Sequence, residues 1–446
     1  MSVLKCPADL TLISDEMSIG DVVRDIIRQG PHEEPLHVLD LDDVVQKHYG
    51  WRDQMPRVSP FYAVKCNDDP RILQTLITLG LGFDCASKGE LECILDFGVE
   101  PERIIFAQPA KSIPSLLYAR SKKVSVMTFD SGIELEKIHQ YYPEAQLVLR
   151  MRHDALKVRC LLGKKFGCDP VKEAPALLRK AAKLRMNVVG ISFHVGSDCE
   201  EHEVYYDAVK SARGLFDYAK SIGYELSLLD IGGGFPGDHN KPIDRYAQAV
   251  NRAIDHFFPA EENVRVIAEP GRYYVASAVT LVSFVDSKRF VTERLEDGTE
   301  RTRVFYYLND GIYGTFYCTA HEGQEAIPIV QRKTGAKEYS SSVWGPTCDV
   351  IDLILPDIVL PELDIGDSVV FENVGAYGLV TSCRFNGFPL PKVIAYLREG
   401  TWKILEDLTA ASVALASAHS LEDGMDGKVL VTHKNYTPLA ETTYLV

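Results

Sequence analysis

The sequence lacks an uninterrupted hydrophobic segment long enough to cross a membrane. Its most apolar windows, residues 276–285 and 351–359, are short or contain Asp and Pro, whereas a spanning helix needs about 20 apolar residues. The first residues also lack the apolar core of a signal peptide, because Asp9, Asp15 and Glu16 follow within a few positions. We therefore expect a protein that neither spans a membrane nor carries a targeting signal.

Positive charge is scarce relative to negative charge. The chain has 48 lysine and arginine residues against 63 aspartate and glutamate residues, which gives a formal net charge of −15. Nucleic acids and anionic membranes attract surfaces with the opposite imbalance. We expect neither as a partner.

The ten cysteines form no CxxC pair and no regular framework. Scattered thiols of this kind are typical of proteins in a reducing compartment and not of disulfide scaffolds. We therefore expect a cytoplasmic location, and we predict no metal site.

Short β-branched and aromatic segments alternate with helical patterns from residue 61 onward. The intervening segments carry apolar residues at helical spacing, as at Ala208, Ala212 and Leu215. Eight such strand-and-helix pairs are typical of a (β/α)₈ barrel, whereas a doubly wound sheet usually has fewer strands. The predicted strands are 61–66, 83–86, 104–107, 124–128, 147–151, 188–195, 226–231 and 264–269.

The texture changes after about residue 276, where strands follow one another without helices. Residues 279–291 and 303–310, separated by the turn residues Asp297 and Gly298, read as a β-hairpin. We therefore expect an α/β protein with a barrel over residues 37–276 and a second, mainly β domain over 277–446, joined by part of 1–36. Residues 405–446 carry no motif, and we expect part of them to be disordered.

Polar side chains lie unusually often where the predicted barrel strands end, and this is the edge at which barrel enzymes carry out chemistry. They are Lys65, Asp84, Arg150, His194 with Ser197, the glycines 232–234, and Glu269 with Arg272. One buried lysine or histidine is more often structural than functional. Together, an amine, a glycine cradle for a phosphate and a carboxylate for a ring nitrogen are the parts that hold pyridoxal phosphate.

These motifs resemble those of the eukaryotic-type ornithine decarboxylase family, a barrel-fold group of pyridoxal-phosphate-dependent decarboxylases of basic amino acids. The resemblance runs from about residue 37 to 400. It is carried by PFYAVKCN (60–67), GFDCAS (82–87), SFHVGS (192–197), LLDIGGGFPG (228–237), AEPGRYYVASA (268–278), NDGIYG (309–314), WGPTCD (344–349), FENVGAY (371–377) and FNGF (385–388).

The resemblance implies pyridoxal 5′-phosphate as the cofactor, Lys65 as the Schiff-base lysine and Glu269 as the partner of the pyridine nitrogen. His194 is expected to stack on the ring. The remaining cofactor-binding residues that it implies are Asp84, Arg150, Ser197, Gly233, Gly234, Gly271, Arg272 and Tyr377.

The resemblance also implies the reaction, the conversion of ornithine to putrescine. Cys348 is expected to return a proton to Cα after carbon dioxide leaves, and Asp349 to bind the distal amine of the substrate. Phe385 is expected to supply an apolar wall. In this family the thiol and its neighbouring acid reach the cofactor of the other subunit, which implies a homodimer with shared active sites.

The departures from the family pattern gather at the distal end of the substrate site. Where the family usually carries a Tyr-Asp pair followed by His, this chain has His-Glu-Gly at 321–323, and Val350 and Arg384 replace a glycine and a small hydroxyl residue. Two interpretations of His321 and Glu322 stay open. Glu322 still pairs with the ornithine amine, or its carboxylate, displaced by ~1.5 Å, indicates lysine, arginine or a substituted diamino acid as the substrate.

Other functions compete with this one. Relatives exist that keep the fold, lose the cofactor and regulate by binding another protein, but Lys65, Glu269 and Cys348 all remain here. A racemase on the same barrel is disfavoured by the acid beside the thiol. A diaminopimelate-type decarboxylase needs a cationic distal pocket, whereas the distal residues here are mainly acidic.

Overall fold

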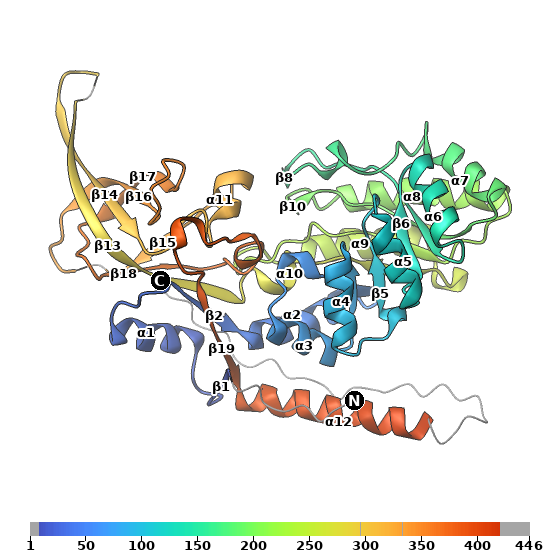
Figure 1. Ribbon diagram of the computed structural model, residues 1–446, viewed down its shortest axis with the longest axis horizontal. Helices are drawn as coiled ribbons and strands as arrows, with labels where there is room; N and C mark the ends of the chain where they lie inside the picture. Colours follow the sequence, from blue (N-terminus) through green and yellow to red (C-terminus); the bar gives the residue numbers. More distant parts are fainter. Residues whose placement is uncertain (1–8, 295, 332, 420–446) are drawn as a thin grey trace. The chain divides into compact units, whose positions relative to one another are not determined.

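The computed structural model describes residues 9–419 except 295 and 332, and these residues form two compact units (Figure 1). The barrel unit contains residues 50–276, and the sheet unit contains the described residues up to 49 and from 277 onward. The expected domain boundary at residue 37 is therefore too early. Strand β2 (Leu36–Asp40) belongs to the sheet unit because it pairs with β13 (Val279–Arg294) and β19 (Lys392–Arg398).

In the barrel unit, eight of the described strands close into a barrel, and all of their pairings are parallel. This confirms the predicted fold class. Most strands are shorter than their sequence patterns because their ends turn into loops that carry polar residues. The strands are β3 (Val58–Ala63), β4 (Gly82–Cys85), β5 (Ile104–Phe106), β6 (Val126–Phe129), β7 (Gln146–Arg150), β9 (Asn187–Ser192), β11 (Leu228–Asp230) and β12 (Arg265–Ala268).

Helices surround these strands (Figure 1). Ser87, Ser112 and Ser131 cap three of them, each accepting a hydrogen bond from the backbone three residues later. The apolar stripe predicted around Ala208 is buried on α8. The helices are α3 (Pro70–Thr78), α4 (Lys88–Asp96), α5 (Ile113–Ser121), α6 (Gly132–Tyr141), α7 (Ala174–Lys183), α8 (Val204–Ser221), α9 (Asp244–Phe257) and α10 (Arg272–Val275).

The interior of the barrel is filled by side chains from several strands. The buried cluster comprises Phe61, Ile105, Ala107, Val148, Leu228 and Ile267. Because these side chains plug the barrel, the polar strand ends are left as the place for a site. A separate two-stranded ribbon joins β8 (Val158–Cys160) to β10 (Ser197–Cys199).

The sheet unit is built on a sheet of nine strands among the described residues, with β1 (Leu10–Ile13) and β17 (Leu353–Pro361) at the two ends of its main path. Strand β13 is its centre, because it pairs with β2, β14 and β18. The remaining strands are β14 (Glu300–Leu308), β15 (Pro328–Val330), β16 (Glu338–Trp344) and β18 (Ser368–Phe371).

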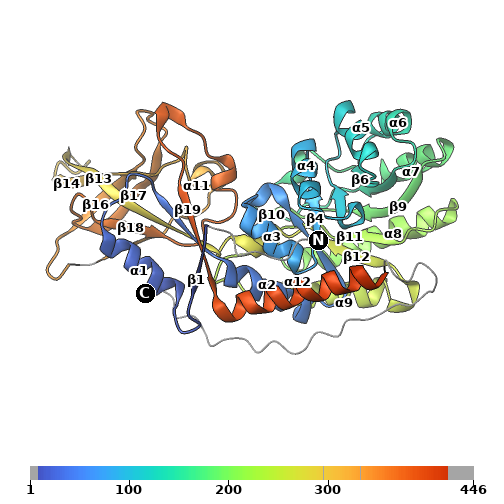
Figure 2. The ribbon, with the colours of Figure 1, turned by 60° about the horizontal axis from the view of Figure 1, so that its bottom comes forward.

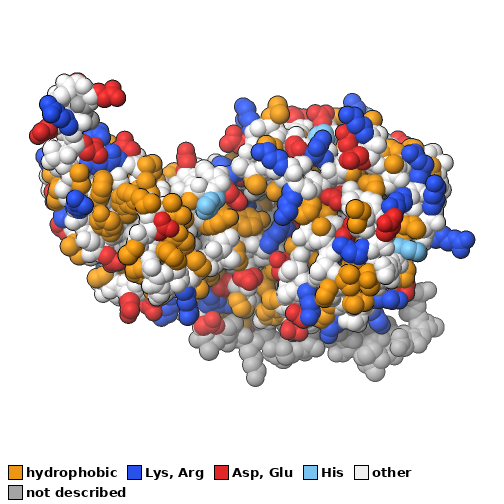
Figure 3. Space-filling view, turned by 45° about the horizontal axis from the view of Figure 1, so that its top comes forward, with side chains coloured by type: hydrophobic (Ala, Val, Ile, Leu, Met, Phe, Trp, Pro, Cys, Tyr) orange, Lys and Arg blue, Asp and Glu red, His pale blue; other side chains and the backbone are white. Residues whose placement is uncertain are grey.

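The predicted hairpin is formed by β13 and β14, which pair antiparallel over Val285 to Arg294. Gly298 lies in its turn with φ +83°, a left-handed conformation that favours glycine. Charged side chains gather on the projecting end of this hairpin (Figure 3).

Four helices complete the described part of the chain: α1 (Ile19–Gln29), α2 (Leu41–Gln54), α11 (Tyr317–Glu322) and α12 (Glu399–His419). Sequence analysis missed α1, although Ser18 and Asp21 form a capping box there. The first part of the tail, residues 405–419, belongs to α12 (Figure 2). Residues 420–446, on which the expectation of partial disorder also falls, lie outside the described range. No helix in the described chain is long and apolar enough to cross a membrane.

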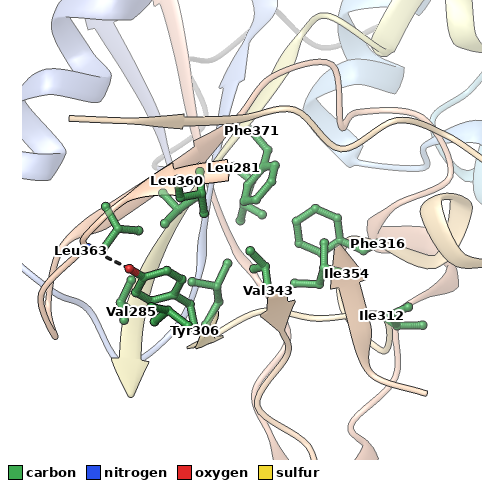
Figure 4. Packing of buried hydrophobic residues seen from close by; sticks show 13 residues of the cluster. Leu281, Val285, Tyr306, Ile312, Phe316, Val343, Ile354, Leu360, Leu363 and Phe371 are labelled. Atoms are coloured by element: carbon green, nitrogen blue, oxygen red, sulfur yellow. Dashed lines mark hydrogen bonds between the residues drawn. The ribbon is translucent and has the colours of Figure 1, made fainter. Parts of the chain in front are cut away.

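The core of the sheet unit joins the hairpin to the strands that carry the WGPTCD and FENVGAY motifs (Figure 4). Phe316 packs edge-on against Phe371, with 4.8 Å between ring centroids. Tyr306 lies in the same cluster, and its hydroxyl accepts a hydrogen bond of 3.0 Å from the backbone of Leu363. The loops that follow these strands therefore start from a rigid base.

Candidate active site

Lys65, just after β3, and Asp84 of the neighbouring strand β4 form an ion pair. The register aligns Ala63 of β3 with Asp84 of β4. Lys65 does not end the strand as predicted. It lies in the 3₁₀ turn Val64–Cys66, because pairing with β4 stops at Ala63. Its side chain is 41% exposed, whereas that of Asp84 is 1% exposed. The amine is therefore reachable and held by a buried carboxylate.

Three acids are buried close to this lysine. Burial, followed by the charges of Asp230 and Asp84, raises the pKa of Glu269 well above its usual range. Burial also raises the pKa of Asp230 to about 6, although its carboxylate accepts hydrogen bonds from Ser192 (2.7 Å) and the Gly232 backbone (2.9 Å). One carboxyl oxygen of Glu269 and one of Asp84 are buried without a hydrogen-bond partner. Such atoms are costly unless a ligand satisfies them.

His194 follows β9 and carries a neutral imidazole. Burial, together with the charges of Arg150 and Lys65, lowers its pKa well below the usual range. Its Nδ1 accepts a hydrogen bond of 3.1 Å from the Gly196 backbone. The ring is therefore oriented from one edge and leaves its face for stacking.

The glycines at positions 233 and 234 stand where side chains do not fit. A Cβ on Gly233 would lie 2.6 Å from the carbonyl oxygen of Glu269, and a Cβ on Gly234, where φ is +102°, would lie 2.4 Å from that of Gly196. At Gly271 it would lie 2.8 Å from the Cβ of Cys66. Glycine at these positions therefore lets neighbouring segments of the site pack closely against one another.

Arg272 is buried beside the glycine loop, at the start of α10. Its Nε donates a hydrogen bond of 3.1 Å to the hydroxyl of Ser197. A buried guanidinium beside a hydroxyl and a glycine loop suits a phosphate. Together with the partnerless oxygen of Glu269, this set fits pyridoxal phosphate, which has an anionic end and a basic ring nitrogen.

The other predicted residues lie in the sheet unit. Cys348 and Asp349 occupy the loop between β16 and β17, and the thiol residue is exposed. The backbone of Cys348 donates a hydrogen bond of 3.1 Å to Asn386. The neighbouring Val350 is 77% exposed.

A buried acid that sequence analysis missed, Asp352, holds this loop. Its carboxylate accepts hydrogen bonds from the backbones of Ile312 (2.8 Å) and Thr347 (3.0 Å) and from the Thr347 hydroxyl (2.7 Å). A Cβ on either Gly311 or Gly345 would lie 2.2 Å from the same carboxylate. The glycines of NDGIYG and WGPTCD thus make room for Asp352. An acid a few residues after a glycine motif was the sequence signal that could have indicated this buried carboxylate.

Tyr313 is a second residue that sequence analysis missed. Its hydroxyl donates a hydrogen bond of 2.6 Å to Asp349, and its ring stacks on Phe385 with centroids 4.5 Å apart. This hydrogen bond lowers the pKa of Asp349 and raises that of Tyr313 to about 12. The acid expected to bind an amine is therefore kept ionised and oriented by an aromatic pair.

The segment around His321 and Glu322, which differs from the family pattern, forms α11. In this helix the ring of Tyr317 packs on His321 with centroids 4.5 Å apart. Glu322 is its last residue, followed by Gly323 with φ +69°. Earlier in α11, the Cys318 thiol donates a hydrogen bond of 3.6 Å to the carbonyl of Tyr377. Tyr377 itself has φ +54°, a strained conformation for a bulky residue. The segment that carries Glu322 and the loop that carries Tyr377 are thus linked.

Comparisons with known proteins agree on one kind of protein. Residues 41–276 match the family described as pyridoxal-dependent decarboxylase, pyridoxal binding domain. Over 405 residues the chain is 42% identical to ornithine decarboxylase of Rattus norvegicus, covering 87% of this chain and 88% of that one. It is also 42% identical to antizyme inhibitor 2 of Xenopus laevis, with 90% of each covered.

Solved structures resemble the chain as well. The arginine decarboxylase of Paramecium bursaria Chlorella virus, bound to agmatine, superposes with a TM-score of 0.78 at 38% identity, covering 84% of this chain and 99% of that one.

Proposed function

The chain belongs to the pyridoxal-dependent decarboxylases that include ornithine decarboxylase, and from this we propose that it converts ornithine to putrescine. It is a decarboxylase that uses pyridoxal 5′-phosphate and acts on a basic amino acid. Two features found together carry the proposal. Lys65 is accessible and held by the Asp84 carboxylate, and Glu269 has a buried carboxyl oxygen without a hydrogen-bond partner.

When bound, pyridoxal phosphate supplies an electron sink for the charge left on Cα as carbon dioxide departs. Ser197, Gly233, Gly234, Arg272 and Tyr377 are the residues we assign to its phosphate, and Gly271 keeps the backbone beside them close. Arg150 and Asp84 support the ring and the lysine from the barrel wall.

Lys65 carries the cofactor, and Asp84 holds its amine in place. Glu269 holds a proton in the cofactor-free site because burial and the neighbouring acids raise its pKa, so its carboxyl would pair with the ring nitrogen of the cofactor and keep that nitrogen protonated. His194 is neutral and therefore stacks without competing for that proton. These residues prepare the site to stabilise negative charge as it develops.

Cys348 and Asp349 act on the substrate. The thiol is exposed and returns a proton to Cα, while the Asp349 carboxylate, kept ionised by Tyr313, binds the distal amine. Glu322 supplies the second acid beside His321, and Phe385 forms an apolar wall.

The test is carbon dioxide release by the cofactor-loaded protein with ornithine, lysine and arginine, using Lys65→Ala as the blank. A strong preference for ornithine supports the proposal. Preference for lysine or arginine would show instead that Glu322 and Val350 have altered the distal pocket. The similarity to a solved arginine decarboxylase makes that second outcome a specific alternative.

A non-catalytic regulatory protein is the other candidate, because similarity to antizyme inhibitor 2 equals that to ornithine decarboxylase at 42% identity. The retention of Lys65, Glu269 and Cys348 speaks against it. Failure to bind the cofactor, together with no release of carbon dioxide from any of the three amino acids, would favour the regulatory function.

We further assign a homodimer in which Cys348 and Asp349 serve the cofactor of the other subunit. Val350 and Ile351, 77% and 55% exposed, are apolar neighbours of the thiol that a second copy would cover. Mixing inactive Lys65→Ala and Cys348→Ala chains tests this assignment. Activity that returns on mixing requires sites made from two chains, and no return would contradict shared sites.

A cytoplasmic location follows from the same proposal. No disulfide joins the cysteines from Cys66 to Cys383 that the structure describes, which suits a reducing compartment. Localisation of the tagged full chain in cells is the direct test.

A further inference from the structure

Asp198 is a buried carboxylate that the proposed reaction does not use. It lies in β10, its side chain is 8% exposed, and one of its oxygens contacts two cations. Oδ2 is 2.5 Å from the guanidinium of Arg159 and 2.9 Å from the amine of Lys241. Its φ of +46° places it in the left-handed region, where aspartate is one of the few tolerated side chains.

The residues on either side of Asp198 contact the glycine loop and Arg272. The Ser197 hydroxyl accepts the hydrogen bond from Arg272, and the backbone of Cys199 donates a hydrogen bond of 3.0 Å to the carbonyl of Gly234. The backbone of Asp198 is therefore a direct continuation of the surface that we assign to the cofactor phosphate.

The side chain of Asp198 faces a different element, residues 155–165, which we call the strap. Strand β8 of the strap pairs antiparallel with β10, in register Cys160 with Ser197. The strap buries little apolar surface, and its Leu156 is 90% exposed. A segment with so few apolar contacts depends on its polar ties.

We propose that Asp198 is a positioning residue that fastens the strap to the phosphate-binding surface and thereby slows the release of pyridoxal phosphate. This inference rests on the proposed function, because it needs the cofactor at that surface. Without the carboxylate, Arg159 and Lys241 face each other as like charges in a partly buried place. The strap then separates from β10, and Ser197 and Cys199 lose the alignment that serves the phosphate.

The test uses the variant Asp198→Asn, which keeps the size of the side chain and removes its charge. Hydrogen exchange of the cofactor-free full chain should become faster in residues 155–165 and stay unchanged in α6. In the loaded protein, pyridoxal phosphate should dissociate about tenfold faster or more, followed by its absorbance, because the loss of a paired buried charge is worth at least that factor. Dissociation of pyridoxal, which lacks the phosphate, should change much less.

Two further variants complete the design. Arg159→Met breaks the same contact from the strap and should reproduce both effects if Asp198→Asn does not fold. Asp238→Asn is the matched control, because it removes a carboxylate 3.4 Å from Lys241 that does not contact Arg159.

The outcomes separate this inference from the proposed function. Unchanged exchange of the strap in Asp198→Asn and Arg159→Met overturns the fastening role, even if the wild type binds the cofactor. Faster release of pyridoxal and pyridoxal phosphate alike overturns the link to the phosphate. A wild-type chain that binds no pyridoxal phosphate overturns the proposed function and, with it, the cofactor part of this inference.

Discussion

The barrel unit and the sheet unit carry the acids of the proposed reaction in opposite environments. In the barrel unit Asp84, Asp230 and Glu269 are buried, and burial raises the pKa values of the last two. In the sheet unit Asp349 lies on a loop beside an exposed thiol, and a hydrogen bond lowers its pKa. Burial is suited to holding a cofactor permanently, whereas exposure is suited to a substrate that must enter and leave.

The barrel unit should show the largest effect of any single change. Lys65→Ala removes the only group we assign to attach the cofactor, so turnover should fall on the order of 10⁴-fold or more. The measurement is carbon dioxide release together with cofactor absorbance. Lys88→Ala, a surface lysine that pairs with Glu92, is the control, and residual turnover close to wild type would contradict the role of Lys65.

A change at the exposed loop should be smaller but still large. Cys348→Ala should lower kcat by about 10²- to 10⁴-fold, the contribution typical of a general acid, while cofactor binding is retained. Mass spectrometry of the products will show whether the proton is still added at Cα. Cys383→Ala, another exposed cysteine, should behave as wild type. Equal effects of the two variants would contradict the assignment of Cys348 as the proton donor.

Buried and exposed acids should also differ in how they couple stability to pH. The pKa of Asp230 is about 6 in the folded chain, against about 4 for an unfolded aspartate. The folded state therefore keeps a proton that the unfolded chain releases, and the free energy of unfolding falls as pH rises from about 4 to 6. Asp230→Asn should remove this contribution to the decrease in the free energy of unfolding, roughly 3 kcal/mol. Urea titrations of the cofactor-free protein over this pH range will measure it.

Asp310 provides the matched variant in the sheet unit, because burial raises its pKa to about 6 as well. Asp310→Asn should remove a similar fall over the same pH range but leave the absorbance of bound cofactor unchanged. If neither variant alters the pH dependence of unfolding, burial does not control these two acids.

The smallest effect is expected at Asp349, a partly buried acid whose pKa is lowered by one hydrogen bond. In Tyr313→Phe the pKa of Asp349 should rise, so that the carboxylate becomes neutral at a higher pH and KM for ornithine increases toward acid. One hydrogen bond of this kind limits the change to about tenfold, with kcat nearly constant. Tyr317→Phe keeps the ring against His321 and serves as the control. A KM profile identical to wild type would mean that Tyr313 does not orient Asp349.

The site residues that the sequence could predict follow from strand order, and those that were missed depend on contacts distant in sequence. The proximity of Lys65, Asp84 and Glu269 could be predicted because parallel strands end at one edge of a barrel, so that sequence order translates into proximity. Asp352 was missed because its partner Ile312 is 40 residues away in sequence. The contact is made by the backbone of Ile312, so the residue type at that position gives no indication of it. Asp230 was taken as part of an apolar strand, since a buried acid is recognised only by its neighbours.

The boundary at residue 37 was wrong for a related reason. The pairing partners of β2 lie in β13 and β19, and no local pattern at residues 36–40 indicates which unit they join. Sequence analysis also overlooked the capping box at Ser18, and α1 was therefore not predicted.

The path of the chain through the sheet unit has a consequence for its synthesis. The barrel unit is continuous from residue 50 to 276 and can fold as soon as it emerges from the ribosome. The carboxylate of Asp42, by contrast, accepts a hydrogen bond from the backbone of Arg398, 356 residues later, which at cellular rates of translation is a delay of roughly 20 to 70 s. During the first part of that interval, until β13 has been synthesised, the apolar strand Leu36–Asp40 has neither of its partners β13 and β19. Nascent chains are therefore most exposed to aggregation at their first strands, and a chaperone acting there would matter more than one acting on the barrel.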